Sequence, residues 1–427
     1  MRRAWLWGLS AVLVIAAVAG SALSVFGRVD RPIVVGILHS ETGPKAISEK
    51  SMIHAEIMAI EEINARGGLL GRRLKPVIAD GRSDWPTYAQ QARKLIDDDH
   101  VSVIFGCWTS ASRKNVRPVV EEKDHLLVYP MAYEGLEESP NIVYTGATAN
   151  QQVIPAVTWS HDVLKAKRVF LVGSDYIWPH TVNAIIKDQL RALRLELVGE
   201  DYIFFGSADV DDVIAEIVKA KPDVIFSTVV GDSNLAFYDR LRRAGVKPDQ
   251  SPVISFSIAE DELRVLASAD TVGHYAAWNY FQSIDRLENQ EYVRRFKARY
   301  GADRVTSDVI TAAYNSVYLW AQAVTEADTE EVGKVRQSIL RQSLNAPEGV
   351  IAIDRETQHT WRPFYLAKMR ADGQFEIVYT TQKPVQPVPY PFGRSRSEWD
   401  AFLNGLYAGW GNQWANPVKK PKSTPSQ

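Results

Sequence analysis

Apolar residues along this chain form short runs, and each run is followed by a loop of polar or aromatic residues. Ile33 to Leu38 is an uninterrupted run of the type expected for a strand buried on both faces of a sheet. Between such runs lie segments with apolar residues at helical spacing, as in residues 53–63. The other strand-like runs are 74–79, 101–105, 126–128, 141–145, 168–172, 195–204, 224–230 and 253–256. This alternation predicts an α/β fold with mostly parallel sheets flanked by helices.

The stretch from Phe105 to Gly135 contains two of these strand ends. Trp108 and Ser110 follow the first strand, at the start of a helix that nearby hydroxyls can cap. The next strand ends at Tyr129. Ligands in open α/β sheets bind at the carboxyl ends of the strands, so we expect these loops to line a ligand site.

The pattern repeats after residue 150, and extended segments near Tyr144 and Tyr280 join the two units. We therefore expect two lobes with facing strand ends, joined by a hinge of crossing segments. The predicted parts are a signal peptide or anchor (1–30), an N-terminal lobe (31–149 and 282–344), a C-terminal lobe (150–281 and 345–382) and a tail (383–427).

Near the C-terminus, three β-rich segments predict a small antiparallel finish, with Asp372-Gly373 as a hairpin turn. These segments are 349–353, 364–369 and 375–380. A proline-rich stretch follows, and then a short helix whose apolar residues between Trp399 and Tyr407 are expected to pack on the body of the protein. The last ten residues are expected to be disordered.

Composition narrows the possible functions. The chain has 427 residues, of which 46% are hydrophobic, as expected for a globular protein of two domains. Its 49 basic and 51 acidic residues give a net charge of −2, which argues against a nucleic-acid partner. The single cysteine, Cys107, excludes an internal disulfide and a multi-cysteine metal site.

The N-terminus has the features of a targeting segment. Arg2 and Arg3 precede an apolar run from Ala4 to Phe26, which ends before Arg28. The run suits a cleaved signal peptide, but its length also suits an uncleaved helix that anchors the protein to the inner membrane. Either interpretation places the rest of the chain outside the cytoplasm, in the periplasm.

Enzyme motifs such as Gly-x-Ser-x-Gly, Walker-type loops and His-Glu-x-x-His are absent, and the eight histidines are scattered. We therefore expect a binding protein with no catalytic residue, cofactor or metal. Loops rich in Trp, Tyr, Ser and Thr suit a small, neutral, polar ligand.

Several motifs together resemble one family. They are Ser40-Glu41-Thr42-Gly43, residues 61–68, Asp80-Gly81, residues 83–86, 106–110, Tyr129-Pro130, Tyr133-Glu134-Gly135, residues 173–176, 227–233 and 277–281. The chain is similar to the urea and short-chain-amide branch of the type I periplasmic binding proteins, which serve ABC transporters. The resemblance implies a ligand held between two lobes and passed to an ABC permease.

The resemblance also implies a ligand-binding set from both lobes: Trp108, Ser110, Tyr129, Met131, Tyr176, Trp178, Val230 and Asp232. Trp108 and Tyr129 would form a wall, and the Ser110 hydroxyl and the Met131 backbone would bond the amide. Tyr176 and the Val230 segment would close from the second lobe. Met131-Ala132 departs from the residues expected in this family, and Trp108 and Tyr129 could also be ordinary strand-end core.

Three alternatives remain open. An anchored sensor of urea or amides would signal to a partner protein instead of a permease. A binder of branched-chain amino acids would need an acidic group for the ammonium, and Asp80, Asp175 and Asp232 are candidates that could equally be turn residues. A hydrolase of urea or amides is the remaining alternative.

Overall fold

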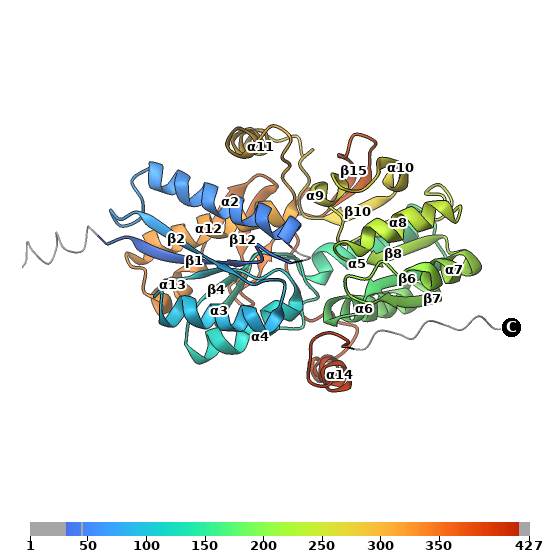
Figure 1. The fold of residues 1–427 in the computed structure, drawn as a ribbon, viewed down its shortest axis with the longest axis horizontal. Helices are drawn as coiled ribbons and strands as arrows, with labels where there is room; N and C mark the ends of the chain where they lie inside the picture. The colour runs from blue at the N-terminus through green and yellow to red at the C-terminus, as the bar shows by residue number, and fades with distance from the viewer. Residues whose placement is uncertain (1–30, 44–45, 418–427) are drawn as a thin grey trace, which may run out of the picture.

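The computed structural model describes residues 31–43 and 46–417. It has two lobes side by side, each built on a sheet with helices on both faces (Figure 1). The expected targeting segment, residues 1–30, and the expected disordered tail, residues 418–427, lie outside the described residues.

The first lobe contains a five-stranded parallel sheet in the order β2-β1-β3-β4-β5. Helices α2 and α12 pack against each other over one face, and α3 and α4 lie over the other (Figure 1). The strands are β1 (Ile33–His39), β2 (Leu74–Asp80), β3 (Ile104–Gly106), β4 (Leu127–Tyr129) and β5 (Ile142–Tyr144). The helices are α2 (Ala46–Ala65), α3 (Trp85–Asp97), α4 (Ser110–Glu122), α11 (Leu287–Tyr300), α12 (Asp308–Ala327) and α13 (Val332–Ile339).

The second lobe contains a seven-stranded sheet in the order β15-β14-β10-β9-β8-β6-β7, in which β14 and β15 are antiparallel to their neighbours. Its strands are β6 (Arg168–Ser174), β7 (Glu196–Ile203), β8 (Val224–Thr228), β9 (Val253–Ser255), β10 (Tyr275–Trp278), β14 (Tyr365–Met369) and β15 (Phe375–Thr380). Its helices are α5 (Ala149–Asp162), α6 (Ile177–Leu193), α7 (Asp211–Ala220), α8 (Ser233–Arg243), α9 (Glu260–Leu263) and α10 (Ser268–Thr271). The predicted α/β class with mostly parallel sheets is confirmed.

The three β-rich segments near the C-terminus are antiparallel strands, as predicted, but they do not form one small sheet. Residues 349–353 pair in a separate three-stranded sheet of β11 (Ser343–Ala346), β12 (Gly349–Ile353) and β13 (Thr360–Trp361), whereas β14 and β15 extend the sheet of the second lobe. The turn at Asp372-Gly373 does join β14 to β15, with Gly373 at φ +72°. Sequence patterns identify antiparallel segments but not the sheet that each one joins.

Several segments cross between the lobes and bind one another. Asn279 donates hydrogen bonds from Nδ2 to the carbonyl oxygens of Gln151 (3.0 Å) and Pro363 (2.6 Å). Next to them, the buried Arg362 guanidinium contacts Asp308 at 2.9 Å and Glu348 at 3.0 Å. These buried bonds tie the crossing segments to one another.

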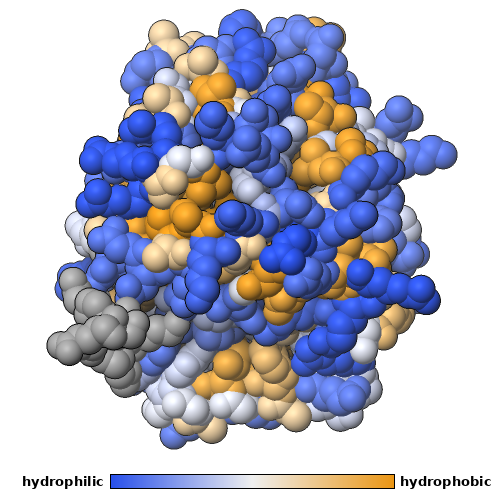
Figure 2. All heavy atoms as spheres, turned by 90° about the vertical axis from the view of Figure 1, so that its right-hand side faces the viewer, coloured by the Kyte–Doolittle hydropathy of each residue, from blue (hydrophilic) through white to orange (hydrophobic). Residues whose placement is uncertain are grey.

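The C-terminal helix α14 (Arg396–Gly409) lies below the junction of the two lobes in Figure 1 and packs on α6. Trp399 is buried, as predicted for a helix that packs on the body. Hydrophobic residues on the face in Figure 2 form separate groups among hydrophilic ones. Within residues 31–43 and 46–417, no helix is both long and apolar enough to cross a bilayer.

Candidate functional site

The first wall of the candidate site comes from the ends of β3 and β4. The chain leaves β3 through Cys107, whose φ of +68° turns the backbone sharply, and α4 begins three residues later at Ser110. Thr109 caps this helix by accepting a hydrogen bond from the Ser112 amide at 2.9 Å. Tyr129, at the end of β4, donates its hydroxyl to the Trp108 carbonyl at 3.0 Å. The structure thus brings Trp108, Ser110 and Tyr129 together.

The second wall comes from the start of α6. Tyr176 is the N-cap residue of this helix and is buried. Burial raises the pKa of Tyr176 well above its usual value, so its hydroxyl stays protonated. Helix α6 packs against α4 of the first lobe, which brings the two walls to the same junction. An aromatic chain also crosses the junction, since the Phe205 ring lies 5.2 Å from Tyr176 and 5.6 Å from Trp85.

A buried charged network, which sequence reasoning missed, lies directly behind the first wall. The Ser110 hydroxyl donates to the Glu134 carboxylate, and Arg113 lies 3.2 Å from Glu134. Arg113 also contacts Glu137 at 2.9 Å, and Lys114 contacts Glu137 at 3.1 Å. Arg117 also lies 3.8 Å from Glu137 and pairs with Glu121 at 2.7 Å, so three cations face three carboxylates and the charges of this cluster balance. The sequence did contain one indication of this network: Ser110, Arg113 and Lys114 are spaced at i, i+3 and i+4, which places them on one face of a helix.

Aromatic rings hold the Arg113 network in place. The Arg113 guanidinium lies 4.8 Å from the centre of the Tyr129 ring and 4.2 Å from that of Tyr133. Tyr133 stacks on Tyr144 at 5.2 Å, and Tyr144 stacks on His359 at 4.2 Å. Burial lowers the pKa of His359 to about 3, so this imidazole is neutral at pH 7. The stack adds no charge to the site.

The remaining predicted ligand residues differ in their surroundings. The Met131 carbonyl oxygen lies against Gly146, where an added Cβ would be only 2.0 Å away. Trp178 is buried, and its ring centre lies 6.4 Å from that of Tyr176. Val230 is also buried, and its amide donates to Ser174 Oγ at 3.1 Å. Asp232 is exposed at the start of α8.

Two aspartates considered as ammonium partners have structural roles. Asp80 accepts hydrogen bonds from the amides of Glu41 and Arg82, at 2.9 and 2.8 Å, and so orders the loop after β1. Asp175 contacts His180 at 2.7 Å and accepts from Asn416 at 2.7 Å. Neither Asp80 nor Asp175 therefore needs a ligand to satisfy its carboxylate.

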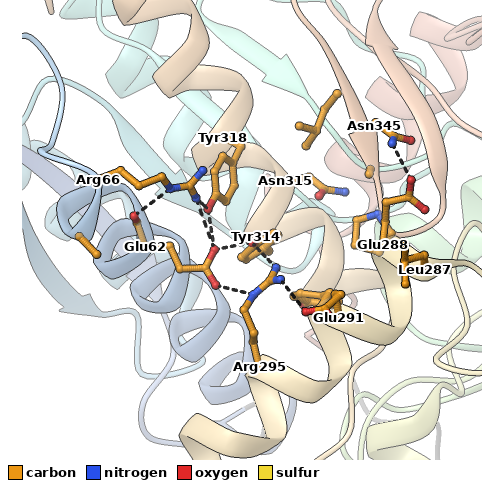
Figure 3. Close-up of a pocket in the computed structure, with 15 residues that line it drawn as sticks. Glu62, Arg66, Leu287, Glu288, Glu291, Arg295, Tyr314, Asn315, Tyr318 and Asn345 are labelled. Carbon is orange, nitrogen blue, oxygen red and sulfur yellow. Dashed lines mark hydrogen bonds and ion pairs between the residues drawn. The ribbon is translucent and has the colours of Figure 1, made fainter.

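A separate open pocket of about 710 Å³ lies on the outer side of the first lobe, between α2, α11, α12 and β11. Figure 3 shows Glu62 at its edge, where the Glu62 carboxylate accepts from Tyr314 and Tyr318 and pairs with Arg295. These polar groups are thus mutually bonded, and none of the predicted ligand residues lines the pocket. In the part of the chain that the structure describes, no group of three or more His, Cys, Asp or Glu side chains is placed to hold a metal ion.

Comparisons with known proteins agree with this architecture. A family model described as a periplasmic binding protein domain matches residues 33–396. A solute-binding protein of an ABC transporter from R. palustris, in complex with 4-hydroxybenzoate, superposes with a TM-score of 0.75 at 20% identity, covering 83% of this chain and 98% of that one. This likeness shows the fold.

Two curated relatives differ in the function that their names give and in how much of this chain they match. The leucine-, isoleucine-, valine-, threonine- and alanine-binding protein of Pseudomonas aeruginosa is 20% identical over 350 residues, or 80% of this chain and 91% of the relative. Limonene hydroxylase of Geobacillus stearothermophilus is 30% identical over 124 residues, or 29% of this chain. The chain spans only 23% to 58% of the length of the first three curated relatives. Because the family model covers most of the chain and the two-lobed fold agrees with it, this chain belongs to the periplasmic binding protein domain family.

Proposed function

We propose that this protein captures urea or a short-chain amide between its lobes and delivers it to an ABC permease outside the cytoplasm. One observation carries the proposal. Helix α4 of one lobe, where Ser110 bonds to Glu134, packs against α6 of the other lobe, whose N-cap residue is Tyr176, and the buried charged groups beside this junction compensate one another. Such a site is strongly dipolar without an excess charge.

A neutral amide has complementary chemistry. The N-terminal ends of α4 and α6 carry partial positive charge, which suits the ligand's carbonyl oxygen. The Glu134 carboxylate suits its N–H groups. Each buried group left without a partner costs about 1–3 kcal/mol, so a ligand lacking one of these groups would bind more weakly. Trp108 and Tyr129 would exclude water around it.

Ligand capture by closure requires contacts to both lobes, because a ligand shifts the equilibrium only through its different affinities for the open and closed states. Trp108, Ser110, Tyr129 and Met131 would act from the first lobe. Tyr176, Trp178, Val230 and Asp232 would act from the second lobe.

A branched-chain amino acid is the second candidate ligand. The Pseudomonas aeruginosa relative, named for binding such amino acids, favours it. A zwitterion could place its carboxylate at the helix N-termini and its ammonium at Glu134. Against it, Arg113 already compensates Glu134 at 3.2 Å.

Calorimetry with urea, formamide and acetamide, compared with leucine, isoleucine and 4-hydroxybenzoate, tests the ligand class. Heat of binding from urea or an amide supports the proposal, whereas heat from the amino acids alone would refute it in favour of the second candidate. Sequencing the N-terminus of the mature protein separates a released binding protein from an anchored sensor. Sustained ammonia release from urea would instead indicate a hydrolase.

A further inference from the structure

The C-terminal segment 384–416, here called the strap, runs along both lobes after it leaves the second one. At its start, the Pro389 carbonyl accepts a hydrogen bond from the Leu136 amide at 2.8 Å. The fit at this point is close, since a Cβ added to Gly135 would lie 2.2 Å from the Pro389 oxygen. Arg396 of the strap contacts Glu138 at 3.0 Å. These contacts fasten the strap to the loop that carries Glu134.

The middle of the strap is fastened to the second lobe. Arg394 makes two hydrogen bonds to the Asp188 carboxylate of α6, at 2.7 and 2.9 Å. The Arg394 guanidinium also stacks over Trp399, 4.4 Å from the ring centre. Trp410 then meets His180 of α6 edge to face, with 5.0 Å between ring centres.

The end of the strap reaches the site itself. The Trp414 carbonyl accepts from the Ile177 amide at 3.0 Å, and Ala415 pairs with Tyr176 as an isolated antiparallel bridge. Asn416 donates to Asp175 at 2.7 Å. From the first lobe, the Lys114 ammonium lies 4.9 Å from the centre of the Trp414 ring. Trp414 therefore touches α4 of one lobe and α6 of the other, beside the two candidate walls.

We propose that the strap is a latch that holds the lobes closed and slows release of the ligand, with Trp414 as the residue that joins α4 to α6. The inference depends on the proposed capture of a solute between the lobes, but not on which solute is captured. Opening moves the N-termini of α4 and α6 apart, so it must break either the Lys114–Trp414 contact or the bonds from Trp414, Ala415 and Asn416 to the second lobe.

Trp414→Ala and Asn416→Ala test the latch in the full chain, and Phe392→Ala is the control, because Phe392 lies in the strap but is 93% exposed. Hydrogen exchange of the ligand-free proteins is followed in residues 108–120 and 176–183, and thermal unfolding confirms that each variant is folded. We expect exchange in both segments to be about tenfold faster in Trp414→Ala, several-fold faster in Asn416→Ala, and unchanged in Phe392→Ala.

Exchange at the wild-type rate in both folded strap variants would overturn the latch. This readout needs no ligand, so it remains decisive if urea and the amides fail to bind. For any solute that binds in calorimetry, stopped-flow dissociation should show a rate constant about tenfold higher for Trp414→Ala than for Phe392→Ala. Equal dissociation rate constants would contradict the latch while leaving the capture itself intact.

Discussion

Arg113 Nε lies 2.9 Å from Glu137 Oε1, and both side chains are buried beneath the candidate site. Replacing Arg113 with Met leaves the buried Glu134 and Glu137 carboxylates with too little positive charge. We expect Arg113→Met to lower the free energy of unfolding by about 3–5 kcal/mol. Guanidinium denaturation measures this loss, because urea is a candidate ligand and is unsuitable as the denaturant. Arg93→Met, which breaks an exposed pair with Glu122, should change stability little. Equal losses in the two variants would contradict a structural role for the buried network.

Tyr176→Phe tests the second wall. Removing the hydroxyl deletes one polar contact from the second lobe without deleting the ring, so we expect the dissociation constant for the bound solute to rise about 5- to 10-fold. Tyr318→Phe removes a hydroxyl from the outer pocket shown in Figure 3 and should leave the constant unchanged. Calorimetry measures both, and the reverse pattern would place the solute in the outer pocket.

His39 makes stability depend on pH. Burial alone would lower its pKa, but the nearby charges of Glu56 and Glu49 and the hydrogen bond to Glu56 raise the pKa from 6.5 to about 9. Its stabilising contribution is therefore complete below pH 6.5 and is lost as the pH rises through 9. We expect this loss to be at most about 3 kcal/mol in guanidinium unfolding between pH 6 and 9.5. His39→Gln should abolish this part of the pH dependence, and the exposed His100→Gln should retain it.

Gly146→Ala tests the tight crossing behind Met131. The added methyl group would lie 2.0 Å from the Met131 carbonyl oxygen, so the backbone must shift. We expect a loss of about 1–3 kcal/mol in unfolding free energy, as for other overpacked sites. Gly405→Ala is the matched control in α14, where nothing lies within 4 Å, and it should be neutral or slightly stabilising. No difference between the two would show that the crossing has more room than the structure indicates.

Local pattern was sufficient for the fold class. The run from Ile33 to Leu38 lies in the buried parallel strand β1. This outcome could be predicted because an uninterrupted apolar run suits a strand that is buried on both faces of a sheet. The proximity of Trp108, Ser110 and Tyr129 could also be predicted, because they follow neighbouring parallel strands, whose carboxyl ends lie at one edge of the sheet. Their role in binding stays a prediction.

Long-range pairing could not be predicted. Glu137 is 24 residues from Arg113, and a carboxylate in a loop gives no sign of which helix will face it. Asn416 is 241 residues from Asp175, and a proline-rich segment has no periodicity that indicates what it covers. The three-stranded sheet was missed because strand partners are decided by tertiary contacts and not by the strand sequence.

A crystal structure of the protein grown with urea or acetamide tests the central claim most directly. The account predicts closed lobes with electron density for the solute between Tyr129 and Tyr176, within hydrogen-bond distance of Ser110 or Glu134. Density for the solute in the outer pocket beside Tyr318, with none between the lobes, would contradict it.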